Sequence, residues 1–122
     1  LSCRRDGFAM HQNLPMEYWS VTRADLKKLR VAVQQAVRDG HITPSDLDPF
    51  EASDDKYGPC VHAVVQQMIK PVTYTAGGCS WALMCHPEGL KCDLFVTHGW
   101  AEGIYEFIDK VLYSWPAGTH YA

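Results

Sequence analysis

Residues 92–115 read CDLFVTHGWAEGIYEFIDKVLYSW, and they set our expectation for the fold. The run from Leu94 to Val96 is short and continuously apolar, as in a strand that is covered on both faces. From residue 101 onward, apolar side chains recur at helical spacing. A strand, a loop and a helix in succession make the repeating unit of an α/β sheet. We therefore predict a buried strand at 92–97 and a helix at 101–114.

The predicted strand needs neighbours, because its backbone amides and carbonyls must find hydrogen-bond partners. Residues 72–75 have strand-like composition, and residues 80–84 fit either a strand or a helical turn. These two segments supply one partner strand at most. We therefore predict an α/β fold, or α+β if only one short sheet forms. We expect the missing strands downstream or on another chain.

Helix 23–39 is the best-marked element upstream of this unit. Thr22 is a good N-cap residue, and Asp25 stands where a capping box places its acidic member. Gly40 supplies the stop that commonly follows a helix. Residues 1–20 show no periodicity, so we expect an extended arm there.

A second helix is expected at 57–69. Pro59 is tolerated in its first turn, and Pro71 ends it, because the residue before a proline avoids the helical conformation. The chain then divides into two parts. Residues 1–75 form an N-terminal helical region with an extended arm, and residues 76–122 form the start of an α/β domain.

The composition excludes several classes of function. The chain has 122 residues and a formal net charge of -3, so it lacks the clustered Lys and Arg that nucleic-acid binding needs. No apolar run is long enough to cross a bilayer, and we expect no membrane insertion. Five cysteines without a signal peptide favour free thiols in a reducing compartment, so we expect a cytoplasmic protein. The chain begins at Leu1 rather than Met, which we interpret as processing or as a fragment.

The loop after the predicted strand is the first candidate site. Ligands of open α/β sheets collect at the carboxyl ends of strands, where helix N-termini point their free amides. The candidate ligand-binding residues are Thr97, His98, Gly99, Trp100 and Glu102. The structural alternative is that Thr97 caps the helix, Gly99 makes the turn and Trp100 packs, since a protein uses few of its loops for binding.

Cysteine and histidine side chains form a second candidate site. Zinc takes thiolate and imidazole ligands in tetrahedral sites, and the candidate ligands are Cys79, Cys85, His86 and Cys92. Their spacings lack the Cys-x-x-Cys pairs of common zinc sites, and cysteine is often buried as a plain small hydrophobe. We therefore expect no metal. A nucleophilic pair of Cys85 with His86 is disfavoured, because neighbouring side chains diverge.

The stretch CDLFVTH at 92–98 resembles the opening box of Toll/interleukin-1 receptor (TIR) domains. In that box an aromatic-Asp pair leads into a Phe-rich first strand, which ends in Ser followed by Tyr or His. The sequence departs from the box at two positions, because Cys92 replaces the aromatic residue and Thr97 replaces Ser. The resemblance implies an incomplete TIR-like, flavodoxin-like βα unit preceded by a helical region.

A second resemblance extends over more of the chain. The stretches SWALM (80–84), HPEGLKCD (86–93) and THGWAEG (97–103) resemble an uncharacterised family of protist algal proteins. In that family a longer TIR-like α/β domain continues beyond the equivalent of the last residue here. This resemblance brings no activity with it, but it too implies that the chain is a fragment.

Three alternative functions remain; the TIR resemblance implies the first two, and the cysteine and histidine residues suggest the third. The first is a non-catalytic protein-interaction module, whose partner is another protein or the remainder of its own domain. The second is a NAD-processing enzyme when full length, in which residues 97–100 line the dinucleotide pocket. The glutamate that cleaves NAD in enzymatic TIR domains belongs to a later helix, and neither Glu102 nor Glu106 can be carried over to that role. The third is a small zinc-binding domain. We expect no catalytic residue in this chain, and no cofactor unless a full-length protein binds NAD.

Overall fold

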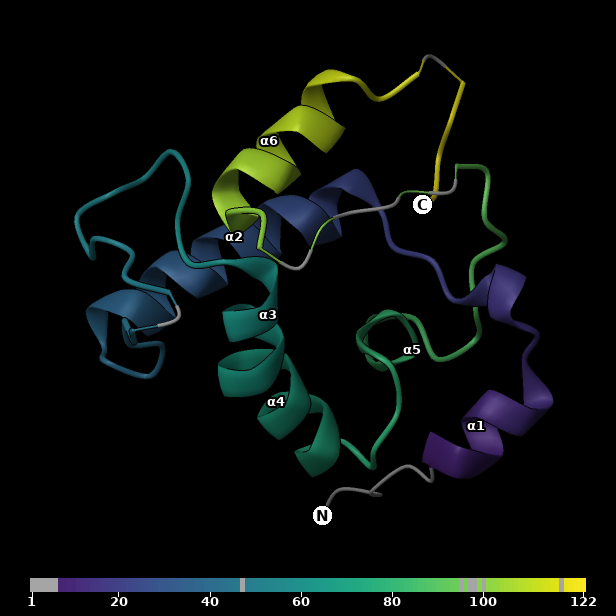
Figure 1. Cartoon of the computed structure of the whole chain (residues 1–122). Helices are drawn as coiled ribbons and strands as arrows, with labels where there is room; N and C mark the ends of the chain where they lie inside the picture. Colours follow the sequence, from purple (N-terminus) through teal and green to yellow (C-terminus); the bar gives the residue numbers. More distant parts are fainter. Residues whose placement is uncertain (1–6, 47, 95, 97–98, 100, 117) are drawn as a thin grey trace.

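The computed structural model describes residues 7–46, 48–94, 96, 99, 101–116 and 118–122. Within these residues the chain is helical and forms no sheet (Figure 1). In chain order the elements are α1 (Gly7–Asn13), the 3₁₀ turn η1 (Met16–Tyr18), α2 (Arg23–Arg38), α3 (Val61–Val64), the π-helix η2 (Val65–Ile69), α4 (Lys70–Thr75), α5 (Trp81–Cys85) and α6 (Ile104–Tyr113). The prediction of an α/β or α+β fold is therefore wrong.

Helix α2 begins and ends as predicted. The Asp25 amide donates to Thr22 Oγ1 at 3.1 Å, and the Thr22 amide donates to Asp25 Oδ2 at 2.8 Å. These two bonds make the capping box. At the other end Gly40 has a φ of +76°, and the His41 amide donates to the Ala36 carbonyl at 2.8 Å. This is a Schellman ending, which turns the chain away after one left-handed residue.

The second predicted helix begins later than expected. It begins at Val61, with Cys60 as its N-cap, and the Cys60 sulfur accepts from the Ala63 amide at 3.4 Å. Pro59 lies outside the helix and is buried. Its carbonyl accepts from the amide of Ile104, which ties the start of α3 to the start of α6.

The same helix continues through Pro71 as α3, η2 and α4. The Lys70 amide donates to the Val65 carbonyl, five residues back, which makes the turn before the proline a π-helix. In a regular α-helix the proline ring clashes with the carbonyl four residues back. The wider π-turn relieves that clash, so the helix goes on to Thr75. The predicted end at Pro71 and the predicted strand at 72–75 are therefore wrong.

The described part of the N-terminal arm is helical rather than extended. Helix α1 lies against the loop between α4 and α5, because the Gly7 amide donates to the Gly77 carbonyl at 2.9 Å. The Ser80 amide donates to His11 Nε2 at 3.0 Å. A helix this short depends on such tertiary contacts, which a search for periodicity does not reveal.

The described residues of the predicted strand, 92–94 and 96, lie outside any β-ladder. The Cys92 amide donates to the Glu17 carbonyl at 2.7 Å. The amides of Asp93 and Leu94 both donate to the Tyr121 carbonyl, at 3.0 and 3.2 Å. Two successive amides that share one carbonyl cannot follow the alternation of a β-ladder. The prediction of a buried strand is therefore wrong for these residues.

Helix α6 confirms the main part of the helix predicted at 101–114. It packs on α2, and Figure 1 shows the two helices against each other. The core takes side chains from both sides of the expected boundary at 75/76. Its buried hydrophobic members are Val21, Leu26, Leu29, Val33, Ile42, Val61, Val64, Ile104, Tyr105 and Ile108. Among the described residues, no helix is both long enough and apolar enough to span a membrane.

Candidate apolar binding site

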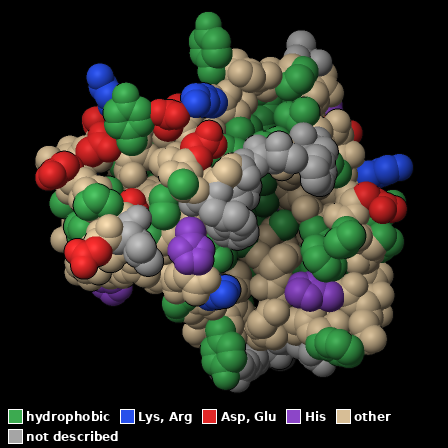
Figure 2. Space-filling view, viewed as in Figure 1, with side chains coloured by type: hydrophobic (Ala, Val, Ile, Leu, Met, Phe, Trp, Pro, Cys, Tyr) green, Lys and Arg blue, Asp and Glu red, His purple; other side chains and the backbone are tan. Residues whose placement is uncertain are grey.

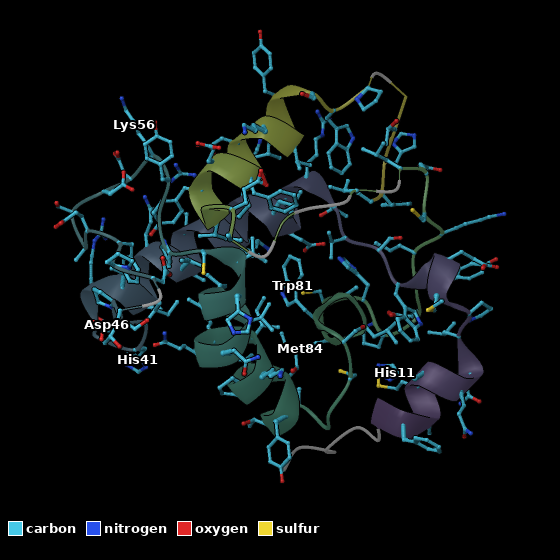
Figure 3. All side chains as sticks on the ribbon, in the orientation of Figure 1. His11, His41, Asp46, Lys56, Trp81 and Met84 are labelled. Atoms are coloured by element: carbon cyan, nitrogen blue, oxygen red, sulfur yellow. The ribbon has the colours of Figure 1, made fainter. Side chains whose placement is uncertain are left out.

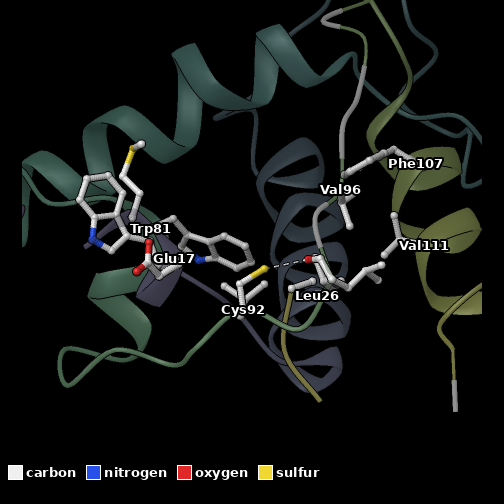
Figure 4. A pocket seen from close by; sticks show the side chains of 13 residues that line it. Glu17, Leu26, Trp81, Cys92, Val96, Phe107 and Val111 are labelled. Carbon is white, nitrogen blue, oxygen red and sulfur yellow. Dashed lines mark hydrogen bonds between the residues drawn. The ribbon is translucent and has the colours of Figure 1, made fainter. Parts of the chain in front are cut away.

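A cavity of about 640 Å³ lies between α5 and α6 and reaches the segment that contains the predicted strand. Figure 4 shows its walls, with Trp81 and Glu17 on one side and two α6 side chains on the other. The described residues that line it are Met16, Glu17, Trp19, Val21, Leu26, Trp81, Ala82, Cys92, Leu94, Val96, Phe107, Val111 and Ala122.

One wall is Trp81, the first residue of α5. Ser80 caps this helix, because its hydroxyl accepts from the Leu83 amide at 3.2 Å. The Ser80 amide in turn donates to His11 of α1. Trp81 points from α5 toward the middle of the molecule, where it packs against the core (Figure 3). The N-cap and the bond to His11 together fix the start of α5, and this places the indole ring of Trp81 in the wall of the cavity.

The other end of α5 is fixed by His86. Its Nε2 lies 2.6 Å from Asp25 Oδ2, on the first turn of α2. Burial raises the pKa of Asp25, but the hydrogen bonds from Thr22 and His86 outweigh it, and the net pKa is lower than usual. Asp25 is therefore an ionised carboxylate at neutral pH, and one group serves both the capping box and the contact with α5.

The opposite wall comes from one face of α6, where Phe107 and Val111 lie one turn apart. Both side chains are half-buried and pack against the core. In Figure 4 they lie beside Val96, with Trp81 and Glu17 on the opposite side. This wall is therefore part of the same apolar face of α6 from which the helix was predicted.

Cys92, Leu94 and Val96 close the cavity between these walls. The Cys92 thiol donates to the Leu94 carbonyl at 3.0 Å, which folds the segment on itself. The Val21 amide donates to the Ala122 carbonyl at 2.6 Å and the Ala122 amide donates to the Val21 carbonyl at 2.9 Å, the pattern of an antiparallel residue pair. Three segments that are far apart in the sequence therefore lie side by side at this edge.

Polar groups are few in the cavity. Among its described lining residues, Glu17 carries the only charged side chain, and it is exposed. The Cys92 thiol is already used by the Leu94 carbonyl. The arrangement can bury an apolar group beside one carboxylate, and it offers little directional hydrogen bonding.

Of the predicted ligand-binding residues, Thr97, His98 and Trp100 lie outside the described part of the chain. Gly99 is exposed, and its carbonyl accepts from the Glu102 amide at 3.2 Å. The Glu102 carboxylate lies 4.0 Å from the Lys110 ammonium group. Glu102 is not among the described residues that line the cavity.

The four predicted zinc ligands occupy different positions. Cys79 is buried before α5, while Cys85 is half-buried at its other end. His86 is engaged with Asp25, and Cys92 lies beyond the following turn. In the part of the chain that the structure describes, no three His, Cys, Asp or Glu side chains form a group that could hold a metal ion.

The Cys85 thiol is poorly suited to act as a nucleophile. Burial raises its pKa, and the nearby Asp25 carboxylate raises it further. The thiolate is the reactive form of cysteine, so a raised pKa leaves less of it at neutral pH. His86, the base in the sequence-based pairing, has its Nε2 directed at Asp25 instead.

The residues of the cavity that the sequence did not reveal come mainly from the N-terminal segment. Met16 and Trp19 belong to a stretch without periodicity, and they meet α5 and α6 only in the folded chain. Their aromatic and apolar character is a signal of packing or of an interface. It does not indicate which distant segment they contact.

We compared the chain with protein-family models, curated proteins and solved structures. None matches. The resemblances to TIR domains and to the algal family therefore stay predictions.

Proposed function

We propose that this chain is a non-catalytic protein-interaction module, which takes an apolar side chain of its partner into the cavity between α5 and α6. The observation that carries the proposal is the lining, which combines two tryptophans and several aliphatic side chains with a single charged one. Aromatic residues and Met are enriched where proteins bind one another. A buried anchor in such a pocket supplies much of the affinity of an interface.

A small polar ligand fits this cavity less well. Small-molecule sites combine apolar walls with several placed polar groups that fix the orientation of the ligand. Here the one thiol that faces the cavity is engaged, and Glu17 lies at the exposed edge. An extended protein segment needs fewer directional contacts inside the cavity, because its backbone can bind outside.

The charge around the cavity favours a basic neighbour for the apolar anchor. Glu17 places a carboxylate beside the opening, and the whole chain has a formal net charge of -3. Acidic side chains also gather on the loop between α2 and α3, which contributes none of the described residues that line the cavity (Figure 2). We therefore expect a Trp, Phe or Leu anchor flanked by Lys or Arg, since opposite charges speed association and fix register.

An array of ten-residue peptides tests this directly. Each peptide carries a central Trp, Leu or Ser flanked by either Lys or Glu, and binding is measured by isothermal titration calorimetry. We expect the protein to bind the Trp and Leu peptides with flanking Lys, and to ignore the Ser peptides. Absence of binding to every peptide would overturn the proposal.

Two pairs of variants locate the binding. Val111→Arg fills the cavity, while Val31→Arg places the same charge at an exposed valine of α2 that does not line it. Glu17→Lys reverses the charge at the opening, and Glu51→Lys is its control on an exposed loop. Val111→Arg should abolish binding, and Glu17→Lys should shift preference toward flanking Glu. If both behave like their controls, the peptides bind elsewhere.

The NAD-processing alternative has its own test. Three of the four residues it relies on lie outside the described part of the chain, so their geometry cannot support it. Incubation of the purified chain with NAD, followed by measurement of released nicotinamide, tests whether residues 1–122 alone have this activity. We expect no release. Release of many nicotinamide molecules per protein molecule would show an enzyme and overturn the interaction module.

A further inference from the structure

A second hollow surface lies on another side of α2, away from α6. Two adjacent depressions of about 200 and 380 Å³ share Ala32, Met68 and Val72. Because they share these residues, they form one groove between α2 and the η2–α4 helix. We name it the α2–α4 groove.

One wall of this groove is a single stripe of α2. Lys28, Ala32, Gln35 and Asp39 line it at intervals of three or four residues, which places them on one helical face. Ala32 and Ala36 lie in the middle of the stripe. Their small side chains leave space above the helix, where larger residues would fill the groove.

The other wall contains the π-helix η2. Met68 belongs to it, and Val72 follows on α4 with 46% of its surface exposed. Methionine is flexible and is over-represented on surfaces that bind several partners. π-Helices are rare and are found frequently at functional sites, where they redirect side chains. Met84 of α5 lies between α4 and α5 and closes one end of the groove (Figure 3).

The exposed charged side chains at the two ends of the groove differ in sign. The end near α5 is lined by Lys28, which is exposed, and by Asp25, whose carboxylate is bonded to the Thr22 amide and to His86. Asp39 and His41 line the other end. Along α2, Lys28 and Asp39 are separated by about 16 Å, which is three turns of helix. The dipole of α2 points the same way as these side-chain charges, because its positive N-terminal end is near Lys28 and its negative C-terminal end is near Asp39.

We infer that the α2–α4 groove binds an amphipathic helix of a partner protein, antiparallel to α2 and about three turns long. Two neighbouring helices with small residues between them leave a groove into which a third helix packs. The antiparallel direction places the positive N-terminus of the partner near Asp39 and its negative C-terminus near Lys28. A basic residue at the first end and an acidic residue at the second complete the match. This inference does not depend on the apolar cavity.

Two synthetic helical peptides of fourteen residues test the inference. Both carry leucines on one face, and they differ only in charge. The forward peptide has Lys near its N-terminus and Glu near its C-terminus, and the reversed peptide exchanges them. Fluorescence anisotropy should show the forward peptide binding about tenfold more tightly. Equal affinities, or no binding, would overturn the inference.

Variants of α2 show whether binding occurs in the groove. The double variant Lys28→Glu with Asp39→Lys should exchange the preference, and both positions are exposed, so the fold tolerates the change. Ala32→Tyr should block both peptides, while Ala24→Tyr, an exposed alanine of α2 outside the groove, should not. Binding that survives Ala32→Tyr would place the peptide elsewhere and refute the inference. So would a dimer of the free protein that Ala32→Tyr dissociates, because the occupant would then be a second copy.

Discussion

At Gly58 the backbone has a φ of +73° and passes over the ring of Tyr105. A Cβ atom added there would lie 2.6 Å from Tyr105 Cδ2, far inside van der Waals contact. We expect Gly58→Ala to lower the free energy of unfolding by about 3 kcal/mol, from backbone strain together with the overlap. Urea unfolding measured by circular dichroism gives the value.

Gly40 is the matched control for this prediction. Its φ of +76° is nearly the same, but no atom lies within 4 Å of an added Cβ. Gly40→Ala should therefore lower the free energy of unfolding only by the strain of the left-handed conformation, about 1 kcal/mol. Equal losses at the two positions would show that the ring of Tyr105 does not restrict Gly58.

Asp25 gives the residue-scale prediction for pH. Although burial raises its pKa, the hydrogen bonds from Thr22 and His86 lower it overall. A folded-state pKa below the unfolded value of about 3.9 means that the carboxylate stabilises the protein above that pH. This stability is lost as the pH falls through the folded-state pKa. Asp25→Asn should cost about 1 kcal/mol at pH 7 and much less at pH 3.

The measurement is urea unfolding of the wild-type protein and the variant at both pH values. Asp46→Asn, at an exposed loop carboxylate, is the control and should differ little from wild type at either pH. A loss from Asp25→Asn that is the same at pH 3 and pH 7 would mean that the carboxylate charge contributes nothing.

At the scale of elements, Arg30 joins α2 to α6. Its Nε and Nη2 donate to the two Asp109 oxygens at 2.8 and 3.0 Å, and Nη2 also donates to the Asp55 carbonyl. Its guanidinium carbon lies 4.6 Å from the Tyr105 ring centroid. Lysine cannot reproduce this planar, forked geometry. Because Asp109 is half exposed, we expect Arg30→Lys to cost only about 1 kcal/mol.

Arg38→Lys is the control, since Arg38 is exposed on the same helix. It should change the free energy of unfolding by less than about 0.5 kcal/mol. Thermal unfolding at low and high salt separates the contributions, because salt weakens the ion pair with Asp109. If Arg30→Lys matches its control at both salt concentrations, this side chain does not hold α2 to α6.

The sequence predicts an element well where its signals are local. Thr22, Asp25 and Gly40 mark both ends of α2, because each acts within one turn of the helix it caps. Pro71 misled the prediction, since the π-turn that accommodates it has no signature that a pattern of apolar residues shows. The predicted end of that helix and the strand after it were wrong for the same reason.

The run from Leu94 to Val96 failed for a different reason. A short apolar run fits a buried strand and an irregular buried segment equally well. The choice depends on long-range hydrogen bonds, which here join the Leu94 amide to the Tyr121 carbonyl and the nearby Cys92 amide to the Glu17 carbonyl. These residues are too distant in the sequence for any local pattern to pair them. The cavity could not be predicted either, because the same three segments form its edge.

At the scale of the whole molecule, the C-terminal segment of the described chain packs beside the cavity. Trp115 Nε1 donates to the Thr119 carbonyl at 2.7 Å, and the His120 amide donates to Asp93 Oδ2 at 3.0 Å. Residues 119–122 thus connect α6 to the segment that closes the cavity. The fold is helical in its core, and irregular backbone pairing completes it at this edge.

Removal of residues 119–122 tests this arrangement. The amides of Val21, Asp93 and Leu94 all donate to carbonyls within this segment, so they should lose protection against hydrogen exchange by about tenfold or more. The amides in the middle of α2 have partners within the helix and should exchange as in the intact chain, which controls for global unfolding. Hydrogen exchange followed by mass spectrometry or NMR measures both sets. If the three amides keep their protection, the segment does not close the cavity, and the truncated chain should bind the Trp peptides as the intact chain does. If they lose it, binding of those peptides should weaken with them, because Val21 and Leu94 line the cavity.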